Sequence, residues 1–570
     1  MKKTFLLLFV VFSVLGTQSQ TTLIKNVSLV DVKAGKVLPG YAVLISNGII
    51  EQVGPFKKIK PAANTTEIDG AGKFLMPGLA DAHIHFFQSG GLYTRPDGLD
   101  LRKKYPYEKE LEFGRNNVTD YLSRYLRLGI TTVVDVGGPF ENFNVRDKVA
   151  PTVIAPNILV TGPLFSMVDR PELGSDKPII KITNNAEADS LMQKMLPYKP
   201  DFIKIWYIAG DNLPAEKNFE LVKYIAAKTH ENRLKLAVHA TELKTAQLAV
   251  EAGADILVHS ISDAIIPDDF VKILLQKKVT YIPTLIVGSN YYKVFSGLLP
   301  HHPQDLKWAN AFTYGSLSDP EAMTADEMHP ILKYLRKAGI PASEKTADSI
   351  CAINLVKLVQ AGVNIAAGTD AGNIGTQHAS SYQQELEAMQ AAGMSSAAIL
   401  KAATINTAVG FGKENKWGSI EKGKQADLLL LTKNPLESIG YLQDIDMVFK
   451  NGIALMPDSI LKESPEAIVQ RQLNAYNARN LEAFMATYAD SVELYQFPNQ
   501  LLSKGKKAMI AGYESMFKSI PNLHCQILNR MVNGSVVIDK EKVRIGNEFL
   551  EAVAIYEVAN GKIKKVTFIQ

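Results

Sequence analysis

Apolar runs of strand length alternate with helix-length segments through the middle of the chain. The runs cover residues 79–85, 130–136, 157–161, 202–207, 235–240, 256–260, 280–287 and 364–370. Amphipathic stretches of helical length separate them, for example residues 118–128, 186–196, 219–231 and 243–252. Consecutive Val, Ile and Leu residues are typical of strands that are covered on both faces. Eight such strands alternating with helices predict an α/β fold, a (β/α)8 barrel of the TIM type over residues 79–414.

The segments on either side of this region have a different pattern. Residues 23–30, 41–45 and 49–53 alternate apolar and polar side chains, and Asn47-Gly48 predicts a hairpin turn between the last two. Strand and turn patterning returns over residues 417–455, after the barrel. We therefore expect one small β-sandwich domain built from both flanks, residues 21–78 and 415–456.

The last part of the chain forms a separate unit in this interpretation. Ser464-Pro465 is typical of a helix start, with Ser as the N-cap and Pro at the first helical position. Residues 523–530, 535–539, 548–558 and 562–568 have strand patterns, and Asn560-Gly561 predicts a hairpin between the last two. Residues 463–570 are expected to form an α+β domain, with helices first and the sheet after.

The first twenty residues do not fit the fold. Lys2-Lys3 precedes an apolar run over residues 5–15, and small residues follow at 17–19. This is the pattern of a cleaved signal peptide, so residues 1–20 predict a periplasmic or secreted protein. No later stretch is long and apolar enough to be an integral membrane segment.

Composition narrows the class of protein. The 570 residues carry a formal net charge of +4, with 46% hydrophobic and 21% charged residues. These are globular values, and no basic patch argues for a nucleic-acid partner. The chain has two cysteines, Cys351 and Cys525, in different predicted domains. We expect single buried thiols rather than a disulfide framework.

Two connections within the predicted barrel are unusually long. They span residues 86–117 and 289–362, and both should lie at the same mouth of the barrel as lids or substrate walls. Both are rich in aromatic residues: Tyr93, Tyr105, Tyr107, Tyr291, Tyr292, Trp308 and Tyr314. The pair His301-His302 in the second connection is expected to be an exposed loop pair.

Residues able to bind a metal stand at the ends of five of the eight predicted strands. They are His83, His85, Lys204, His239, His259 and Asp370. In a barrel of this type the C-terminal ends of the strands meet at one mouth. Each of these residues alone fits a hydrogen-bonded core position, but their coincidence at five strands favours one joint site. Several imidazoles with a carboxylate suit zinc or a similar divalent metal.

At this point the chain resembles the amidohydrolase superfamily of metal-dependent hydrolases. The resemblance covers residues 22–455. It rests on Pro-Gly-Leu-Ala-Asp-Ala-His-Ile-His at 77–85, Gly-Thr-Asp-Ala-Gly at 368–372, Gly-Ser-Ile-Glu-Lys-Gly-Lys-Gln-Ala-Asp at 418–427 and Asn434-Pro435. Within the superfamily the chain is most similar to the imidazolonepropionase-like group that contains Xaa-Pro dipeptidases.

The resemblance implies a pair of metal ions. His83, His85 and Asp370 would hold one zinc ion, His239 and His259 a second, and a carboxylated Lys204 would bridge both. The alternative is an unmodified Lys204 and a single metal. Asp370 would act as general base and then general acid in hydrolysis by a metal-activated hydroxide.

Three functions follow from this interpretation. The leading one is hydrolysis of a C–N amide bond, of an Xaa-Pro-type dipeptide or an N-acyl amino acid. A deaminase or a cyclic amide or lactone hydrolase could use the same metal site. The alternative from another class of protein is a metal-free binding protein, built on a barrel that no longer catalyses a reaction. The complete set of metal-ligand residues argues against it. The sequence leaves the substrate-binding residues and the substrate open.

The C-terminal domain resembles the cone-shaped fold of nuclear transport factor and ketosteroid isomerase relatives. The resemblance rests on the helix-then-sheet order and on Ala-Tyr-Asn-Ala-Arg-Asn-Leu-Glu-Ala-Phe at 475–484. Glu493 is the only carboxylate in the first-strand segment 492–498, where catalytic members carry an acid. We therefore expect a binding or dimerising module, and a homo-oligomer through this domain.

Overall fold

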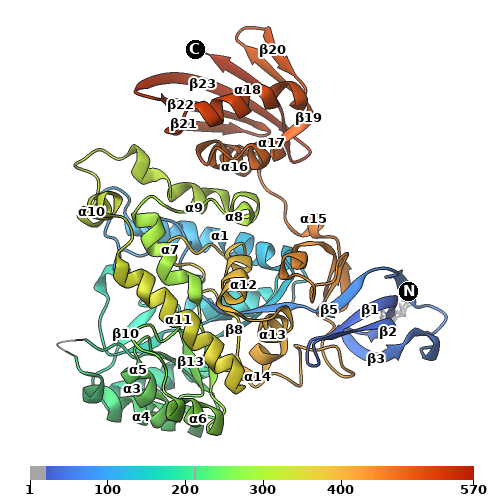
Figure 1. The fold of residues 1–570 in the computed structure, drawn as a ribbon, viewed down its shortest axis with the longest axis vertical. Coiled ribbons are helices and arrows are strands. Elements are labelled where there is room, and N and C mark those ends of the chain that lie inside the picture. The colour runs from blue at the N-terminus through green and yellow to red at the C-terminus, as the bar shows by residue number, and fades with distance from the viewer. Residues whose placement is uncertain (1–20, 211–212, 570) are drawn as a thin grey trace, which may run out of the picture.

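The computed structural model describes residues 21–210 and 213–569, which form three parts of the chain. Figure 1 shows a β domain in blue beside the central barrel, and the C-terminal domain in red above it. The predicted signal peptide, residues 1–20, lies outside the described residues. In the part of the chain that the structure describes, every helix is too short or too polar to cross a bilayer.

The predicted barrel is present. Its strands are β6 (Leu79–Ile84), β7 (Ile130–Asp135), β8 (Asn157–Val160), β11 (Ile203–Trp206), β12 (Leu236–His239), β13 (Ile256–Val258), β14 (Thr280–Ile282) and β15 (Asn364–Ile365). Parallel pairing joins β6, β7 and β8 into one series, and β11, β12, β13, β14 and β15 into another. The series meet where Asp201 donates its N–H to the Val160 carbonyl, 2.9 Å away, and where Ala82 donates to the Ala367 carbonyl at 2.8 Å. These contacts close the barrel.

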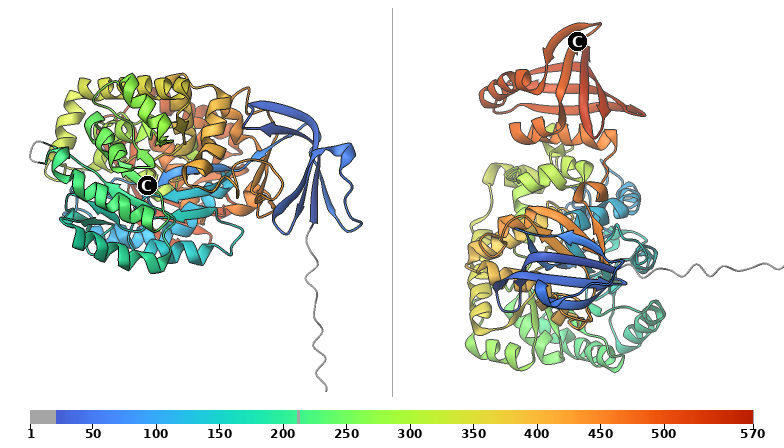
Figure 2. Two further views of the ribbon diagram at one scale, coloured as in Figure 1. Left: turned by 90° about the horizontal axis from the view of Figure 1, so that it is seen from below. Right: turned by 90° about the vertical axis from the view of Figure 1, so that its right-hand side faces the viewer.

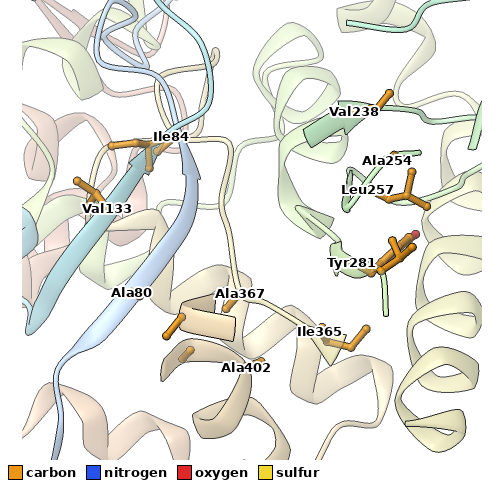
Figure 3. Packing of buried hydrophobic residues seen from close by; sticks show 14 of the residues in the cluster. Ala80, Ile84, Val133, Val238, Ala254, Leu257, Tyr281, Ile365, Ala367 and Ala402 are labelled. Atoms are coloured by element: carbon orange, nitrogen blue, oxygen red, sulfur yellow. The ribbon is translucent and has the colours of Figure 1, made fainter. Parts of the chain in front are cut away.

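Helices surround the strands and supply the outer layer. They are α1 (Tyr107–Arg127), α2 (Glu141–Val149), α3 (Asn185–Met195), α4 (Phe219–Glu231), α5 (Leu243–Ala252), α6 (Asp268–Gln276), α11 (Ala342–Ala361), α12 (Ser381–Ala392), α13 (Ser396–Lys401) and α14 (Thr407–Gly410). The main core lies between this layer and the strands, where Ile84, Val133, Leu257 and Tyr281 are buried (Figure 3). Two short strands, β9 (Leu164–Ser166) and β10 (Ile179–Lys181), extend the sheet beside β11.

Two expectations about the barrel were wrong in part. The seventh apolar run does not continue as a strand, because Thr284 adopts a left-handed backbone (φ 44°) and α7 (Leu285–Phe295) starts directly after it. The long connection 289–362 is a helical cap rather than a loop. It contains the end of α7, then α8 (Pro303–Trp308), α9 (Ala311–Ser316), α10 (Pro330–Ala338) and α11. An apolar run without periodicity does not distinguish a buried strand from a buried helix.

The β domain is assembled from both flanks of the barrel, as expected. Its strands are β1 (Thr21–Asp31), β2 (Lys36–Ser46), β3 (Ile49–Pro55), β4 (Thr66–Asp69), β5 (Phe74–Pro77), β16 (Leu428–Leu431), β17 (Ile445–Lys450) and β18 (Ile453–Leu455). They form one continuous sheet in the order β18-β17-β16-β5-β1-β2-β3, with β4 beside β1. Val43 of β2 and Leu430 of β16 share one core cluster, so the sheet folds over its own interior.

The C-terminal domain has its own hydrophobic core and a six-stranded sheet. Its elements are α16 (Pro465–Asn477), α17 (Leu481–Ala486), β19 (Tyr488–Gln496), β20 (Gln500–Lys504), α18 (Lys506–Ser519), β21 (His524–Asn533), β22 (Val536–Ile545), β23 (Glu548–Ala559) and β24 (Lys562–Ile569). Ser464 caps α16 as expected, accepting a hydrogen bond from the Ala467 N–H. The expected order was wrong in part, because β19 and β20 precede α18. Figure 2 shows the sheet curving above the helices into a cone.

A buried ionic contact joins the C-terminal domain to the barrel. The Glu463 carboxylate, just before α16, accepts hydrogen bonds from Arg471 of α16 and from Arg124 of α1. The same two arginines donate to the carbonyls of Ala309 and its neighbours at the α8–α9 junction. The short helix α15 (Pro457–Ile460) leads into this contact. Cys351 and Cys525 are free thiols in different domains, the first half-buried and the second buried.

Candidate active site

Three ligand atoms converge at the C-terminal end of β6. His83 is the second-to-last residue of this strand and His85 follows the strand, and their Nε2 atoms lie 3.2 Å apart. Asp370 Oδ1 lies 3.2 Å from His83 Nε2 and 3.1 Å from His85 Nε2. Asp370 Oδ1 receives no hydrogen bond from any described residue, although it is buried. Three acceptors facing one another at this distance are what a metal ion requires.

Neighbouring groups hold these ligands in place. The His85 Nδ1–H donates to the Gly137 carbonyl at 2.7 Å, which leaves the Nε2 lone pair free. The buried Asp81 carboxylate accepts hydrogen bonds from the Thr369 N–H at 3.0 Å and the Thr369 hydroxyl at 2.7 Å. Thr369 precedes Asp370, so Asp81 fixes the backbone that carries the carboxylate ligand.

The three remaining predicted ligands line the same cavity. Lys204 lies inside β11, His239 ends β12, and His259 follows β13. The ring centroids of His239 and His259 are 4.4 Å apart, and those of His83 and His259 are 4.8 Å apart. His259 Nδ1 is hydrogen-bonded with the Thr284 hydroxyl at 2.8 Å. All six residues predicted from the sequence are therefore brought together at one mouth of the barrel.

Local backbone strain contributes to this convergence. His259, Thr284 and Asp370 all have a left-handed backbone, with φ of 75°, 44° and 59°. Non-glycine residues rarely adopt this conformation, and it concentrates at functional sites. In β13 the inward side chains are Ile256 and Val258, which pack inside the barrel, so strict alternation would point the next residue outward. The left-handed turn at His259 instead directs its ring into the cavity.

Burial tunes the protonation of the site. It lowers the pKa of His83 to about 4 and those of His239 and His259 well below the usual value, so the imidazoles are neutral. Burial also lowers the pKa of Lys204 to about 7. For Asp370, burial opposes ionisation, but the neighbouring His83 and His85 outweigh it and hold the pKa well below its usual range. Neutral imidazoles and an ionised carboxylate are the forms that bind a metal.

The donor set fits a divalent metal ion. Zinc bonds of about 2.0–2.2 Å to nitrogen and oxygen are compatible with the 3.1–3.2 Å edges of the His83, His85 and Asp370 triangle. Lys204 is 2% exposed, and no hydrogen bond or ion pair of its Nζ occurs within the described residues. An unpaired buried ammonium is unfavourable, whereas the neutral amine at its lowered pKa is the form that reacts with carbon dioxide.

The cavity above these residues has a volume of about 350 Å³ and includes groups that sequence reasoning missed. Arg95 comes from the first long connection, and its guanidinium donates to Asp97 at 2.7 Å and to the Asn373 side-chain oxygen at 2.6 Å. The Tyr291 hydroxyl donates to the same Asn373 oxygen at 2.7 Å. Asn373 follows Asp370 by three residues, so this polar cluster lies next to the metal ligands. Only the length of the connection signalled Arg95 in the sequence.

The other candidates from the long connections lie elsewhere. Of the seven aromatic residues, only Tyr291 lines this cavity, together with Trp206 from β11. His301 is hydrogen-bonded with the Tyr314 hydroxyl at 2.8 Å, and His302 with Glu387 at 3.0 Å, so this pair anchors the cap. Both histidines are half-buried rather than exposed.

Comparison with known proteins agrees with this geometry. Residues 74–455 match the Amidohydrolase family. The chain belongs to this family. The family is generally dependent on divalent metals, and the His83, His85 and Asp370 cluster is where such an ion fits. Residues 469–566 match the SnoaL-like domain, in agreement with the cone-shaped fold of the C-terminal part.

Individual relatives are distant. An enamidase from Eubacterium barkeri is 26% identical over 253 residues, 42% of this chain and 56% of the relative. An imidazolonepropionase from Thermoanaerobacter pseudethanolicus is 33% identical over 130 residues, 21% of this chain and 31% of that protein. The matches thus span about half and a third of these relatives. A crystal structure of a Xaa-Pro dipeptidase with bound methionine superimposes on 77% of this chain and 100% of its own, with a TM-score of 0.59 and 21% identity.

Proposed function

We propose that the protein is a zinc-dependent hydrolase of a C–N amide bond, acting on a dipeptide or an N-acyl amino acid with a free carboxylate. The observation that carries the proposal is the convergence of His83, His85 and Asp370 at one barrel mouth that Lys204, His239 and His259 also line. The fold shared with a Xaa-Pro dipeptidase supports the substrate class. When bound, a pair of divalent ions supplies a hydroxide nucleophile near neutral pH.

Asp370 carries the proton in this proposal. Its Oδ1 has no hydrogen-bond donor among the described residues, and its low pKa keeps it ionised as the substrate binds. It accepts a proton from the attacking water and returns it to the leaving nitrogen. Asp81 and Thr369 hold the backbone of Asp370 during this transfer. His85 is held in one tautomer by Gly137. A carboxylated Lys204 would be anionic and bridge the two ions.

Arg95 is positioned to bind the substrate carboxylate. Three of its five N–H groups are used by Asp97 and Asn373, which fix the guanidinium plane at the cavity wall. Two donors remain, enough for a bidentate contact with a carboxylate. The wall of the cavity also includes Trp206, whose ring lies under the Arg170 guanidinium at 4.9 Å. We infer that the apolar part of the substrate lies against this ring.

A screen of zinc-loaded protein tests the proposal. Dipeptides and N-acyl amino acids are compared with their C-terminal amides, and ammonia release is measured in parallel. We expect hydrolysis of the free acids, with Arg95→Ala raising KM for the acids far more than for the amides. Arg102→Ala, an exposed arginine of the same connection that pairs with Asp100, is the matched control. Ammonia release from purines without amide cleavage would support a deaminase instead.

We further propose self-association through the open face of the C-terminal sheet. Strand registers align Met531, Ile538, Ile555, Thr567, Tyr495 and Leu501 in one row across six strands. Met531 is 64% exposed and Leu501 50% exposed. A flanking row alternates in sign, Glu557, Lys565, Glu493 and Lys504, which a two-fold related copy can complement. Sedimentation should show a dimer that Met531→Lys dissociates, and a monomeric wild-type protein would reject this role.

Export to the periplasm or medium is a proposal that rests on Lys2-Lys3 and the apolar run at residues 5–15. Both cysteines are free thiols, so the number of cysteines gives no separate support for export. Fractionation of cells that produce the full chain tests the location, since a protein retained in the cytoplasm would contradict the signal peptide.

A further inference from the structure

A second cavity lies beside the catalytic one. It has a volume of about 540 Å³ and is bounded by α1, α2 and the turn after β7. Phe87 lines both cavities, and the two share no other described residue. The Phe87 ring packs edge-on against His85, with centroids 5.8 Å apart and planes at 77°. One aromatic side chain therefore separates a metal ligand from the second cavity.

The floor of the second cavity is apolar. Phe86, Leu111 and Val118 are buried there, and Pro139, Phe140 and Val145 add to the apolar lining. Its charged groups are Arg115, Glu141, Lys148 and Asp176, two of each sign. Arg115 pairs with Asp176, and Asn144 donates to Glu141 at 2.8 Å. A neutral apolar group suits this cavity better than an ion.

The turn after β7 contacts both cavities. Its Gly137 carbonyl accepts the hydrogen bond of His85, and Pro139 and Phe140, immediately after, line the second cavity. The buried Asn142, in the first turn of α2, donates to Asp135 at 2.7 Å, which fixes the end of this turn to the barrel. Phe87 is only half-buried, unlike its neighbour Phe86, which is 1% exposed. A ring in this position can move without disturbing the core.

We propose that the second cavity binds the distal apolar part of the substrate's acyl group, which runs past Phe87 from the metal centre. The occupant is thus a medium-length alkyl or aromatic acyl chain, continuous with the amide held in the catalytic cavity. This inference rests on the proposed function only in placing the polar end of the ligand at the metal centre. The structure assigns Phe87 as the residue that determines how much of the acyl chain enters the second cavity.

Binding of straight-chain carboxylic acids tests the proposal without requiring turnover. Acetate, hexanoate and decanoate are titrated calorimetrically into the zinc-loaded full chain. Each fully buried methylene improves binding about fourfold, so decanoate should bind at least tenfold more tightly than hexanoate. Val145→Trp, from a half-buried position that lines only the second cavity, should reduce this ratio to within threefold and leave hexanoate unchanged.

Two further variants complete the experiment. Asn144→Trp fills the same cavity from an exposed position on α2 and should act like Val145→Trp without altering the core. Val532→Trp, at an exposed position of β21 away from both cavities, is the matched control and should keep the wild-type ratio. A ratio of decanoate to hexanoate affinity near one in the wild type overturns the proposal. So does a ratio that stays at the wild-type value in both cavity-filling variants. If Val145→Trp removes the preference for decanoate but the wild-type protein hydrolyses no amide, the proposed function is rejected. The proposal that the second cavity binds an apolar chain then still holds.

Discussion

Replacing Glu463 with Gln removes a negative charge from between two arginines, and we expect it to loosen the C-terminal domain from the barrel. Arg124 Nη2 lies 2.9 Å from Glu463 Oε1, and Arg471 Nε lies 3.0 Å from Oε2. The Arg124 side chain is 2% exposed and that of Arg471 10%. Arg124 keeps a second partner, Asp120, after the substitution. Arg471 keeps only backbone carbonyls.

The pKa of Glu463 gives the size of the stabilisation that this ionic contact contributes. Burial alone would raise it, but the attraction of Arg471 and Arg124 outweighs burial and lowers the pKa to about 2, from an ordinary value of 4.5. A difference of this size corresponds to about 3 kcal/mol of stability near neutral pH. Breaking a buried ion pair costs about 3–5 kcal/mol, and the remaining Asp120 contact places this case at the lower end. Because the pKa is lowered by folding, the contribution is complete above pH 4.5 and disappears as the pH falls towards 2.

Limited proteolysis in urea measures the contact. A protein with several domains does not unfold in one step, so cleavage of the segment 456–463 reports release of the C-terminal domain better than a global transition does. Glu463→Gln should release the domain at lower urea at pH 7, with the difference shrinking below pH 4. Glu482→Gln, at an exposed position of α17 that forms no ion pair with any described residue, is the control. Equal release of Glu463→Gln and wild type at pH 7 would refute the reasoning.

Four further outcomes are expected. His239→Ala and His259→Ala should each lose about one metal equivalent and most activity by elemental analysis and assay, and unchanged metal content in both would exclude the second site. Lys204→Ala should lose activity at least a hundredfold and recover part of it with added short carboxylic acids, whereas Lys204→Arg should not recover. A chain ending at Leu461 should fold and bind metal by circular dichroism and metal analysis, since residues beyond it form a core of their own; loss of folding would contradict this. Intact-mass measurement of the native protein should find the residues before about Gln20 absent, and retention of Met1 would contradict export.

The barrel and the ligand set could be predicted because both depend on local patterns. Buried parallel strands produce continuous apolar runs, and catalytic side chains follow their C-terminal ends, so His83, Lys204 and Asp370 stand out in the sequence. Secondary-structure boundaries failed where local geometry was decisive. Pro283 and the left-handed Thr284 end β14 early, and the apolar residues that follow belong to α7.

Groups that depend on tertiary contacts could not be predicted. Arg95 becomes part of the cavity only because Asp97 and Asn373 orient it, and Asn373 is far away in the sequence. The acids inside the cone were missed for the same reason. Glu541 of β22 is buried and accepts a hydrogen bond from the Tyr556 hydroxyl at 2.8 Å, and burial raises its pKa to about 7. Glu493, the acid singled out in the sequence, instead pairs with Lys504 on the outer face of the sheet.

The junction between β5 and β6 constrains how the chain can reach its native state. Gly78 alone separates the two strands, and its N–H donates to the Asp427 carbonyl at 2.9 Å. A Cβ atom there would lie 2.1 Å from the Thr131 hydroxyl, so a larger residue does not fit at this packed junction. The strand that carries His83 is thus continuous with β5, which pairs with β1 before it and with β16, a strand that follows the whole barrel in the sequence. Such long-range pairing forms slowly, and the sheet next to the metal-binding strand is complete only after the chain has emerged beyond residue 431.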